Sequence, residues 1–174
     1  MDLSLYFEPV SVESLHLSDA GELNDRLLYS VMMYDPSSTL DVSEADIAIL
    51  GVPETRNAYR NPSCSLAPDE IRRQFYQLYP WRRPVRILDL GNLRIGNTVE
   101  DTYSAVSEVV AYLIENKVVP IILGGSNDLA FANYRAYELM ERVANVVSID
   151  SCFDLGRENE PIRSDAYVNK MVLQ

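Results

Sequence analysis

The sequence predicts an α/β fold with three layers, α/β/α, around a mostly parallel sheet. Short apolar runs of strand length end at glycine, proline or aspartate, and they alternate with longer segments in which apolar residues recur at helical intervals. The resulting order, β-α-β-α-β-α-β, is typical of parallel strands joined by crossover helices. With 174 residues the chain is long enough for one domain with a sizeable core.

The N-terminal part is different in character from the rest. Residues 1–45 are acidic and rich in serine and aspartate, and they are predicted to be largely irregular, with one short helix over residues 22–33. The regular alternation starts at residue 46. We therefore divide the chain into an irregular segment, 1–45, and an α/β part, 46–174.

The first strand and helix follow directly. An apolar run over residues 46–53 is stopped by glycine and proline, as expected of a buried strand. A helix is expected to begin at Pro68, because proline fits the first helical turn and the two carboxylates after it suit the positive end of the helix dipole. Pro80 ends the helix. Apolar residues recur on one of its faces: Ile71, Phe75 and Leu78.

A second strand covers residues 85–90, and the helix after it begins at Thr98. Thr98 and Asp101 have the spacing of a capping box, in which each side chain bonds the other residue's backbone N–H. Apolar residues recur along this helix: Tyr103, Val106, Val110, Leu113 and Ile114. This face is predicted to pack against the sheet.

The third strand covers residues 118–123, and Gly124-Gly125 turns it into a helix. These glycines indicate either a tight turn or a cradle for an anion at the helix N-terminus. The apolar face of the helix holds Leu129, Ala132, Ala136 and Leu139. A fourth strand is expected over residues 145–150, and a last helix over residues 166–173.

Candidate site residues gather after the third and fourth predicted strands, at the sheet edge where ligands bind in such folds. Asp150 and Asp154 could hold a hard cation, or they could cap backbone N–H groups. Cys152 could be a soft-metal ligand, a nucleophile or an inert thiol. The single histidine, His16, lies far from these residues in the sequence.

A polar loop after the first strand brings Arg56, Asn57 and Arg60 to the same edge. Arginine could bind a carboxylate ligand there through two parallel hydrogen bonds. Alternatively, these residues anchor the loop to the acidic surface of the domain. The sequence does not decide between ligand binding and anchoring.

Charge and composition exclude several classes of partner. The net charge of −11 argues against nucleic acid and against an anionic membrane surface. No run approaches the roughly 20 apolar residues of a membrane span, and no basic region that would start a signal peptide is evident. Two cysteines are too few for a disulfide framework, so we expect a cytoplasmic protein.

Several short motifs follow one another along the α/β part: Ile49-Leu50-Gly51-Val52-Pro53, Ala67-Pro68-Asp69-Glu70-Ile71-Arg72, Asp89-Leu90-Gly91, Ile122-Leu123-Gly124-Gly125, and the pair Asp150 and Asp154. In this order and spacing they resemble the ureohydrolase superfamily, which includes arginase, agmatinase and formimidoylglutamase. The resemblance covers about residues 46–154. It implies an arginase-like fold of which this chain holds the N-terminal half, with four of the family's eight strands.

The resemblance also implies a chemistry. The family hydrolyses the C–N bond of guanidino or formimino groups with a hydroxide that bridges two Mn²⁺ ions, held by the motifs Gly-Gly-Asp-His-Ser and Asp-Ala-His-x-Asp. Here Asn127 and Cys152 stand at the positions of the two histidine ligands, whereas Asp150 and Asp154 are retained. A neutral amide suits first-row metals less well than imidazole does, so we expect Mn²⁺ to be absent or weakly bound.

Three functions follow as hypotheses. The first is a non-catalytic member of the family that acts as a binding or assembly module. The second is a Mn²⁺-dependent hydrolase of linear amidine C–N bonds, and the third is a truncated product with no independent function. In the family, strands of the second half lie between strands 118–123 and 145–150, so we expect these two strands to pair directly, or the chain to self-associate, to be partly ordered, or to bind a partner that supplies the missing half.

Overall fold

A single sheet organises the protein, whose computed structural model describes residues 1–15, 17, 26–37, 41–157 and 159–172. Its strands are β1 (Phe7–Glu8), β2 (Val31–Met33), β3 (Ile47–Val52), β4 (Ile87–Leu93) and β5 (Val119–Gly124). The order is β1-β4-β3-β5, and β2 also pairs with β4. The pairings β2–β4, β3–β4 and β3–β5 are parallel, and β1–β4 is antiparallel. The mostly parallel sheet is thus confirmed.

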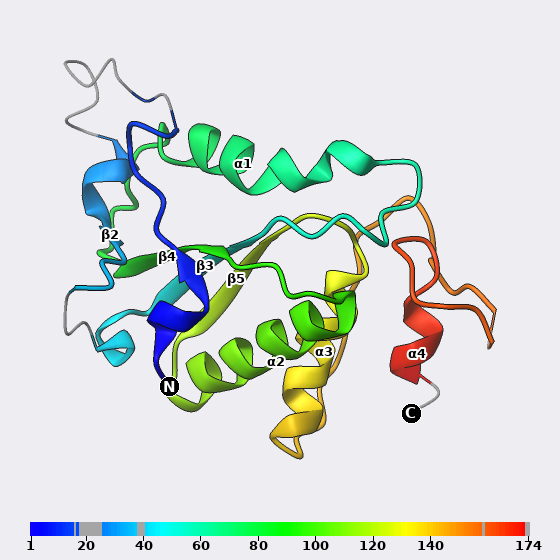
Figure 1. The fold of residues 1–174 in the computed structure, drawn as a ribbon. Helices are drawn as coiled ribbons and strands as arrows, with labels where there is room; N and C mark the ends of the chain where they lie inside the picture. Colours follow the sequence, from blue (N-terminus) through cyan, green and yellow to red (C-terminus); the bar gives the residue numbers. More distant parts are fainter. Residues whose placement is uncertain (16, 18–25, 38–40, 158, 173–174) are drawn as a thin grey trace.

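Helices cover both faces of this sheet (Figure 1). Helix α1 (Ala67–Phe75) lies on one face, and α2 (Val99–Glu115) and α3 (Leu129–Leu139) lie together on the other. Helix α4 (Val168–Val172) follows near the C-terminus, and 3₁₀ turns cover Leu3–Leu5, Leu27–Ser30, Val42–Glu44 and Pro62–Leu66. The predicted three-layer α/β/α arrangement is therefore present.

The main core lies between the sheet and α2. Side chains of β3 and β4, such as Leu50 and Leu88, are fully buried there against Val106, Val110 and Leu113 of α2. Each buried side chain of this size contributes about 1.5–3 kcal/mol to the free energy of unfolding. The apolar face predicted for α2 is the face that packs on the sheet.

The contact of α1 with the sheet is of another kind. Of the predicted apolar face, Phe75 packs against the core while Ile71 and Leu78 are exposed, and α1 also buries Arg72, which is 0% exposed. Arg72 binds Asp89 of β4 through two hydrogen bonds, Nε to Oδ2 at 2.8 Å and Nη2 to Oδ1 at 2.9 Å. The hydroxyl of Tyr76 also donates to Asp89. An ion pair with all its hydrogen bonds satisfied takes the place that an apolar stripe was expected to fill.

The described part of residues 1–45 contains more regular structure than its composition indicated. They contribute β1 and β2, which both pair with β4. The helix expected over residues 22–33 is not found in its described part, because the turn Leu27–Ser30 leads directly into β2. Residues 22–25 and His16 lie outside the described residues.

The strand predicted over residues 145–150 is not found in the structure. Residues 145–150 form no strand and pair with none of the described strands, and Val143 and Ile149 are 100% and 99% exposed. A strand needs a neighbour for its backbone groups, and β5, whose described pairing is with β3 alone, does not supply one. The two segments do not pair directly. The last helix, expected over 166–173, is found at Val168–Val172, and residue 173 is outside the described part.

None of the helices in the described part of the chain has the length and apolar character needed to cross a membrane.

Candidate functional site

The carboxyl ends of β3 and β5 meet, as parallel neighbours should. The N–H of Gly125 donates to the carbonyl of Val52 at 3.0 Å, and the N–H of Ser126 donates to that of Glu54 at 3.0 Å. A Cβ on Gly125 would lie 2.1 Å from the Glu54 carbonyl oxygen, so no larger residue fits. Close approach of two backbones thus explains this glycine.

A buried carboxylate, Asp128, lies at the start of α3. It accepts hydrogen bonds from the hydroxyls of Ser126 and Tyr103, and the hydroxyl of Tyr103 accepts one from Asn57 Nδ2 at 2.9 Å. Burial and the hydrogen bond to Asp128 raise the pKa of Tyr103 well above its usual value, so it stays protonated. The chain of bonds ties Asn57 and its loop to α2 and α3.

Arg56 is engaged in the same loop. Its guanidinium binds the buried carboxylate of Glu54 with two nitrogens and donates to the carbonyls of Asn97 at 2.8 Å and Thr98 at 3.0 Å. Burial opposes ionisation of Glu54, yet the hydrogen bonds from Arg56 hold the pKa of that carboxyl below its usual value. Arg56 therefore joins the loop to the beginning of α2.

Arg60 lies outside this network. It has a positive φ of 60°, and its guanidinium stacks over the ring of Tyr59 at 4.7 Å. Arg163 stacks over the same ring at 5.2 Å. Of the three loop residues singled out in the sequence, two anchor the loop and the third packs on a tyrosine at the surface.

The structure brings Asn127, Asp150 and Asp154 together. Asn127 Nδ2 donates to Asp150 Oδ2 at 3.1 Å, and the polar Asn127 side chain also favours the ionised form of Asp154. Burial and the negative charge of Asp150 raise the pKa of Asp154 above its usual value. The backbone N–H of Cys152 donates to Asp150 Oδ1 at 3.2 Å, and the Cys152 side chain is exposed. The Asn127 amide thus bonds one of the two retained aspartates and influences the ionisation of the other.

The side chains of this cluster offer two carboxylates, one amide and one thiol. An ionised carboxylate only accepts hydrogen bonds, so Asn127 presents its N–H groups, and no lone pair, to Asp150. In the part of the chain that the structure describes, no group of three or more His, Cys, Asp or Glu side chains is placed to hold a metal ion. The contacts around Asp150 are those of a hydrogen-bonded cluster.

Three residues at this edge of the sheet were not predicted from the sequence to belong to the candidate site. Glu54 and Asp128 are buried carboxylates, and Tyr167 is a buried tyrosine whose backbone N–H donates to the carbonyl of Asp154 at 3.1 Å. Burial and the charges of Asp154 and Asp150 raise the pKa of Tyr167. Asp128 and Glu54 each follow a predicted strand closely, which was the available signal, whereas nothing in the sequence marks Tyr167.

Comparisons with known proteins show which family this chain resembles. The sequence matches the arginase family over residues 45–168. Curated relatives include the formimidoylglutamase of Hahella chejuensis, 28% identical over 127 residues, which are 68% of this chain and 39% of the relative. That of Streptococcus gordonii is 30% identical over 123 residues, or 66% of this chain and 37% of the relative. The chain spans less than half the length of these relatives.

Solved structures show the same fold. A Trypanosoma cruzi formiminoglutamase with Mn²⁺ matches at a TM-score of 0.68 and 20% identity, over 79% of this chain and 50% of that one. The Bacillus subtilis formimidoylglutamase matches at a TM-score of 0.70 and 18% identity, over 84% of this chain and 48% of that one. The predicted arginase-like fold, present in part, is thereby confirmed.

Proposed function

The chain belongs to the arginase family, and from this premise we propose that it is a non-catalytic member that acts as a binding or assembly module. The observation that carries the proposal is the hydrogen bond of 3.1 Å from Asn127 Nδ2 to Asp150 Oδ2. A proton donor thereby satisfies a carboxylate that the family resemblance assigns to a metal. The proposal includes a cytoplasmic location, since Cys64 and Cys152 are both free thiols.

The chemistry of the cluster supports this proposal. A water molecule becomes a good nucleophile near neutral pH when a metal ion lowers its pKa to about 7, and in the family's mechanism two ions share that task. Asp150 and Asp154 supply oxygen donors, but the two positions that the resemblance assigns to imidazole hold an amide and a thiol. Imidazole, thiolate and carboxylate bind first-row metals, whereas a neutral amide is a weak ligand.

Metal content tests the proposal directly. After dialysis against Mn²⁺ and then buffer, elemental analysis of the purified chain is expected to find far less than one ion per chain. The matched variant replaces Asn127→His and Cys152→His, which restores the imidazoles, and it should retain more Mn²⁺ than the unmodified protein. Stoichiometric Mn²⁺ in the unmodified protein, with turnover of a formimino or guanidino substrate that Asp150→Ala abolishes, would refute the non-catalytic function.

The assembly surface in this proposal comprises residues 143–153 and the open edge of β5. Val143, Val147, Ile149 and Phe153 are exposed apolar residues of the segment that forms no strand, and a groove of about 570 Å³ runs along it. An exposed apolar surface next to an open strand edge favours association. The occupant we propose is a polypeptide that supplies further strands of the arginase fold, because the solved neighbours are matched over only about half of their length.

Light scattering during size-exclusion chromatography tests this surface. Without its partner, the purified chain is expected to associate through the open edge as its concentration rises. Ile149→Asp places a charge on a side chain that is almost wholly exposed, and it should reduce this association without loss of helical signal. Leu5→Asp, at an exposed apolar residue far from this segment in the sequence, serves as the matched control. A mass that stays monomeric at every concentration would count against the surface.

The alternative function is a Mn²⁺-dependent hydrolase of linear amidine C–N bonds. Two observations favour it: both aspartates of the second metal motif are retained, and the curated relatives are formimidoylglutamases. The same metal and turnover measurements decide between the two functions.

A further inference from the structure

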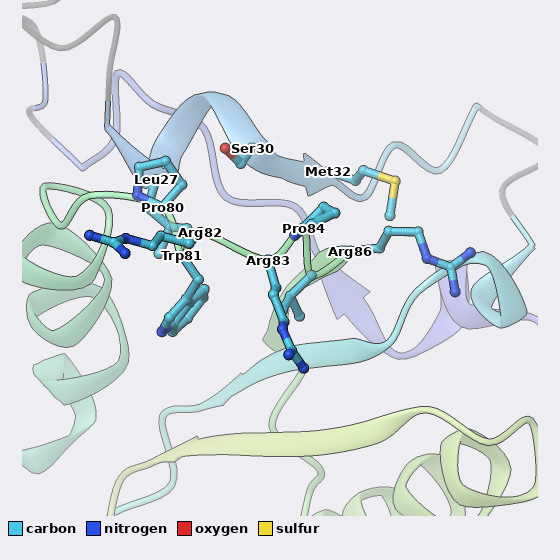
Figure 2. Close-up of a pocket in the computed structure, with 10 residues that line it drawn as sticks. Leu27, Ser30, Met32, Pro80, Trp81, Arg82, Arg83, Pro84 and Arg86 are labelled. Atoms are coloured by element: carbon cyan, nitrogen blue, oxygen red, sulfur yellow. The ribbon is translucent and has the colours of Figure 1, made fainter.

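A second cavity lies at the opposite end of the sheet from the candidate site. It has a volume of about 440 Å³ and lies where β2 and β4 begin, between residues 27–32 and 80–86 (Figure 2). Leu27, which is buried, and Met32 give it an apolar wall, and Trp81 and three arginines form the other side. The volume is within the range of roughly 300–1,000 Å³ that small-molecule sites occupy.

The three arginines of this cavity differ in their hydrogen bonds and ion pairs. Arg86 forms an ion pair with Asp46, with Nη2 2.7 Å from Oδ1. Arg82 and Arg83 form no hydrogen bond or ion pair with any residue in the described ranges, although the protein carries a net charge of −11. The guanidinium groups of two consecutive residues are therefore available to a ligand, and Figure 2 shows them extending in different directions. Guanidinium favours phosphate and carboxylate through paired hydrogen bonds.

The segment that carries these groups is held in place. Pro80 and Pro84 bracket it and fix two of its φ angles, and the ring of Trp81 packs against that of Phe75 with centroids 6.4 Å apart. Figure 2 shows the side chains of Trp81 and Arg83 extending from the segment in the same direction. An indole face beside a free guanidinium suits a ligand that has both a planar group and an anionic group.

We infer that this cavity binds a small organic phosphate with a planar group, which stacks on Trp81 while Arg82 and Arg83 hold the phosphate. Phosphate is favoured over a carboxylate because the guanidinium groups of two consecutive residues, once both turn towards the ligand, match a dianion in charge and in number of acceptor oxygens. The cavity is lined by residues from 27–32 and 80–86, so this inference does not depend on the metal motifs or on the open edge of β5.

The only tryptophan of the chain reports on the cavity. Adenosine monophosphate serves as the probe, with adenosine and inorganic phosphate as separate arms for the planar group and the charge. We expect saturable quenching of Trp81 fluorescence by the monophosphate, weaker quenching by adenosine, and competition by inorganic phosphate. The affinity for the monophosphate should fall as ionic strength rises.

Variants distinguish binding of the monophosphate in this cavity from its nonspecific electrostatic attraction to the protein. Arg82→Gln with Arg83→Gln should weaken binding of the monophosphate by about tenfold or more, as expected for the loss of hydrogen bonds to a charged group. Arg142→Gln with Arg157→Gln removes the same charge from two arginines outside the cavity lining and should leave the affinity unchanged. Calorimetric titration of Trp81→Ala should show loss of the stacking contribution. Absence of quenching at millimolar monophosphate, or equal weakening by both double variants, would overturn the inference.

Discussion

At the scale of single residues, the sequence pattern does not always predict which side chain is buried. The pattern of α1 predicted an apolar buried face, yet the buried residue is Arg72, because Asp89 on β4 satisfies its charge. A sequence gives no sign of which arginine will meet a buried carboxylate that lies on another element. In contrast, the aspartates and Asn127 at the candidate site could be singled out, because their place after predicted strands was readable.

Removal of Arg72 should be costly. Arg72→Ala leaves Asp89 buried without its cation, so we expect a loss of about 3–5 kcal/mol in the free energy of unfolding, measured by urea denaturation. Glu70→Ala, on the same helix, removes the exposed partner of an ion pair with Arg73 and should cost about 1 kcal/mol or less for that pair. Equal losses in the two variants would contradict the importance assigned to the buried pair.

The raised pKa of Asp154 predicts a pH dependence. An acid whose pKa is raised on folding binds its proton more tightly in the folded state, so stability falls as pH rises from the unfolded value of 3.8 through the folded pKa. Asp154→Asn removes the charge and suits the positive φ of 46°. We expect the variant to raise the melting temperature at neutral pH. At pH values below the pKa of the free acid, it should have little effect on the melting temperature. A gain that is the same at both pH values would show that repulsion from Asp150 is not the cause.

At the scale of elements, the sequence predicted correctly those strands and helices that depend on interactions between residues close in sequence. The strands over β3, β4 and β5 and the helices after them lie where the sequence predicted them, within a few residues. The capping box of α2 is formed as expected, with Thr98 accepting from the Asp101 N–H at 3.1 Å and Asp101 accepting from the Thr98 N–H at 2.9 Å. The short strands β1 and β2 were not predicted, because each exists only through its pairing with β4.

The capping box offers a test at this scale. Thr98→Ala removes the acceptor for the Asp101 N–H, and the expected cost is about 1 kcal/mol in the free energy of unfolding, within the range of 0.5–2 for such caps. Thr98→Ser keeps the hydroxyl and should recover most of the loss. Thermal unfolding followed by circular dichroism measures both variants. If the serine variant were as unstable as the alanine variant, loss of the cap could not be the reason.

At the scale of the whole molecule, the sheet is open on the side of β5. The order β1-β4-β3-β5 gives β4 neighbours on both edges, whereas β5 has a described neighbour on one edge only. Residues 145–150 have the composition of a strand, but composition does not supply a partner. Direct pairing with β5, one of the alternatives expected, is not formed for that reason. The fold class could be predicted from the sequence because it depends on the local alternation of strands and helices. Which strand lies next to β5 depends instead on residues far away in the sequence or on another polypeptide.

Hydrogen exchange connects the open edge to assembly. At low protein concentration, the amides of residues 145–150 should exchange almost as fast as in an unfolded chain, because no strand in the described structure pairs with them. The amides of β4, paired on both edges, should be protected at every concentration. When concentration rises far enough for association, protection should increase for residues 145–150 and stay unchanged in β4. Strong protection of residues 145–150 in the dilute monomer would mean that the segment has found a partner within the chain, and the assembly surface beside β5 would then have to be abandoned.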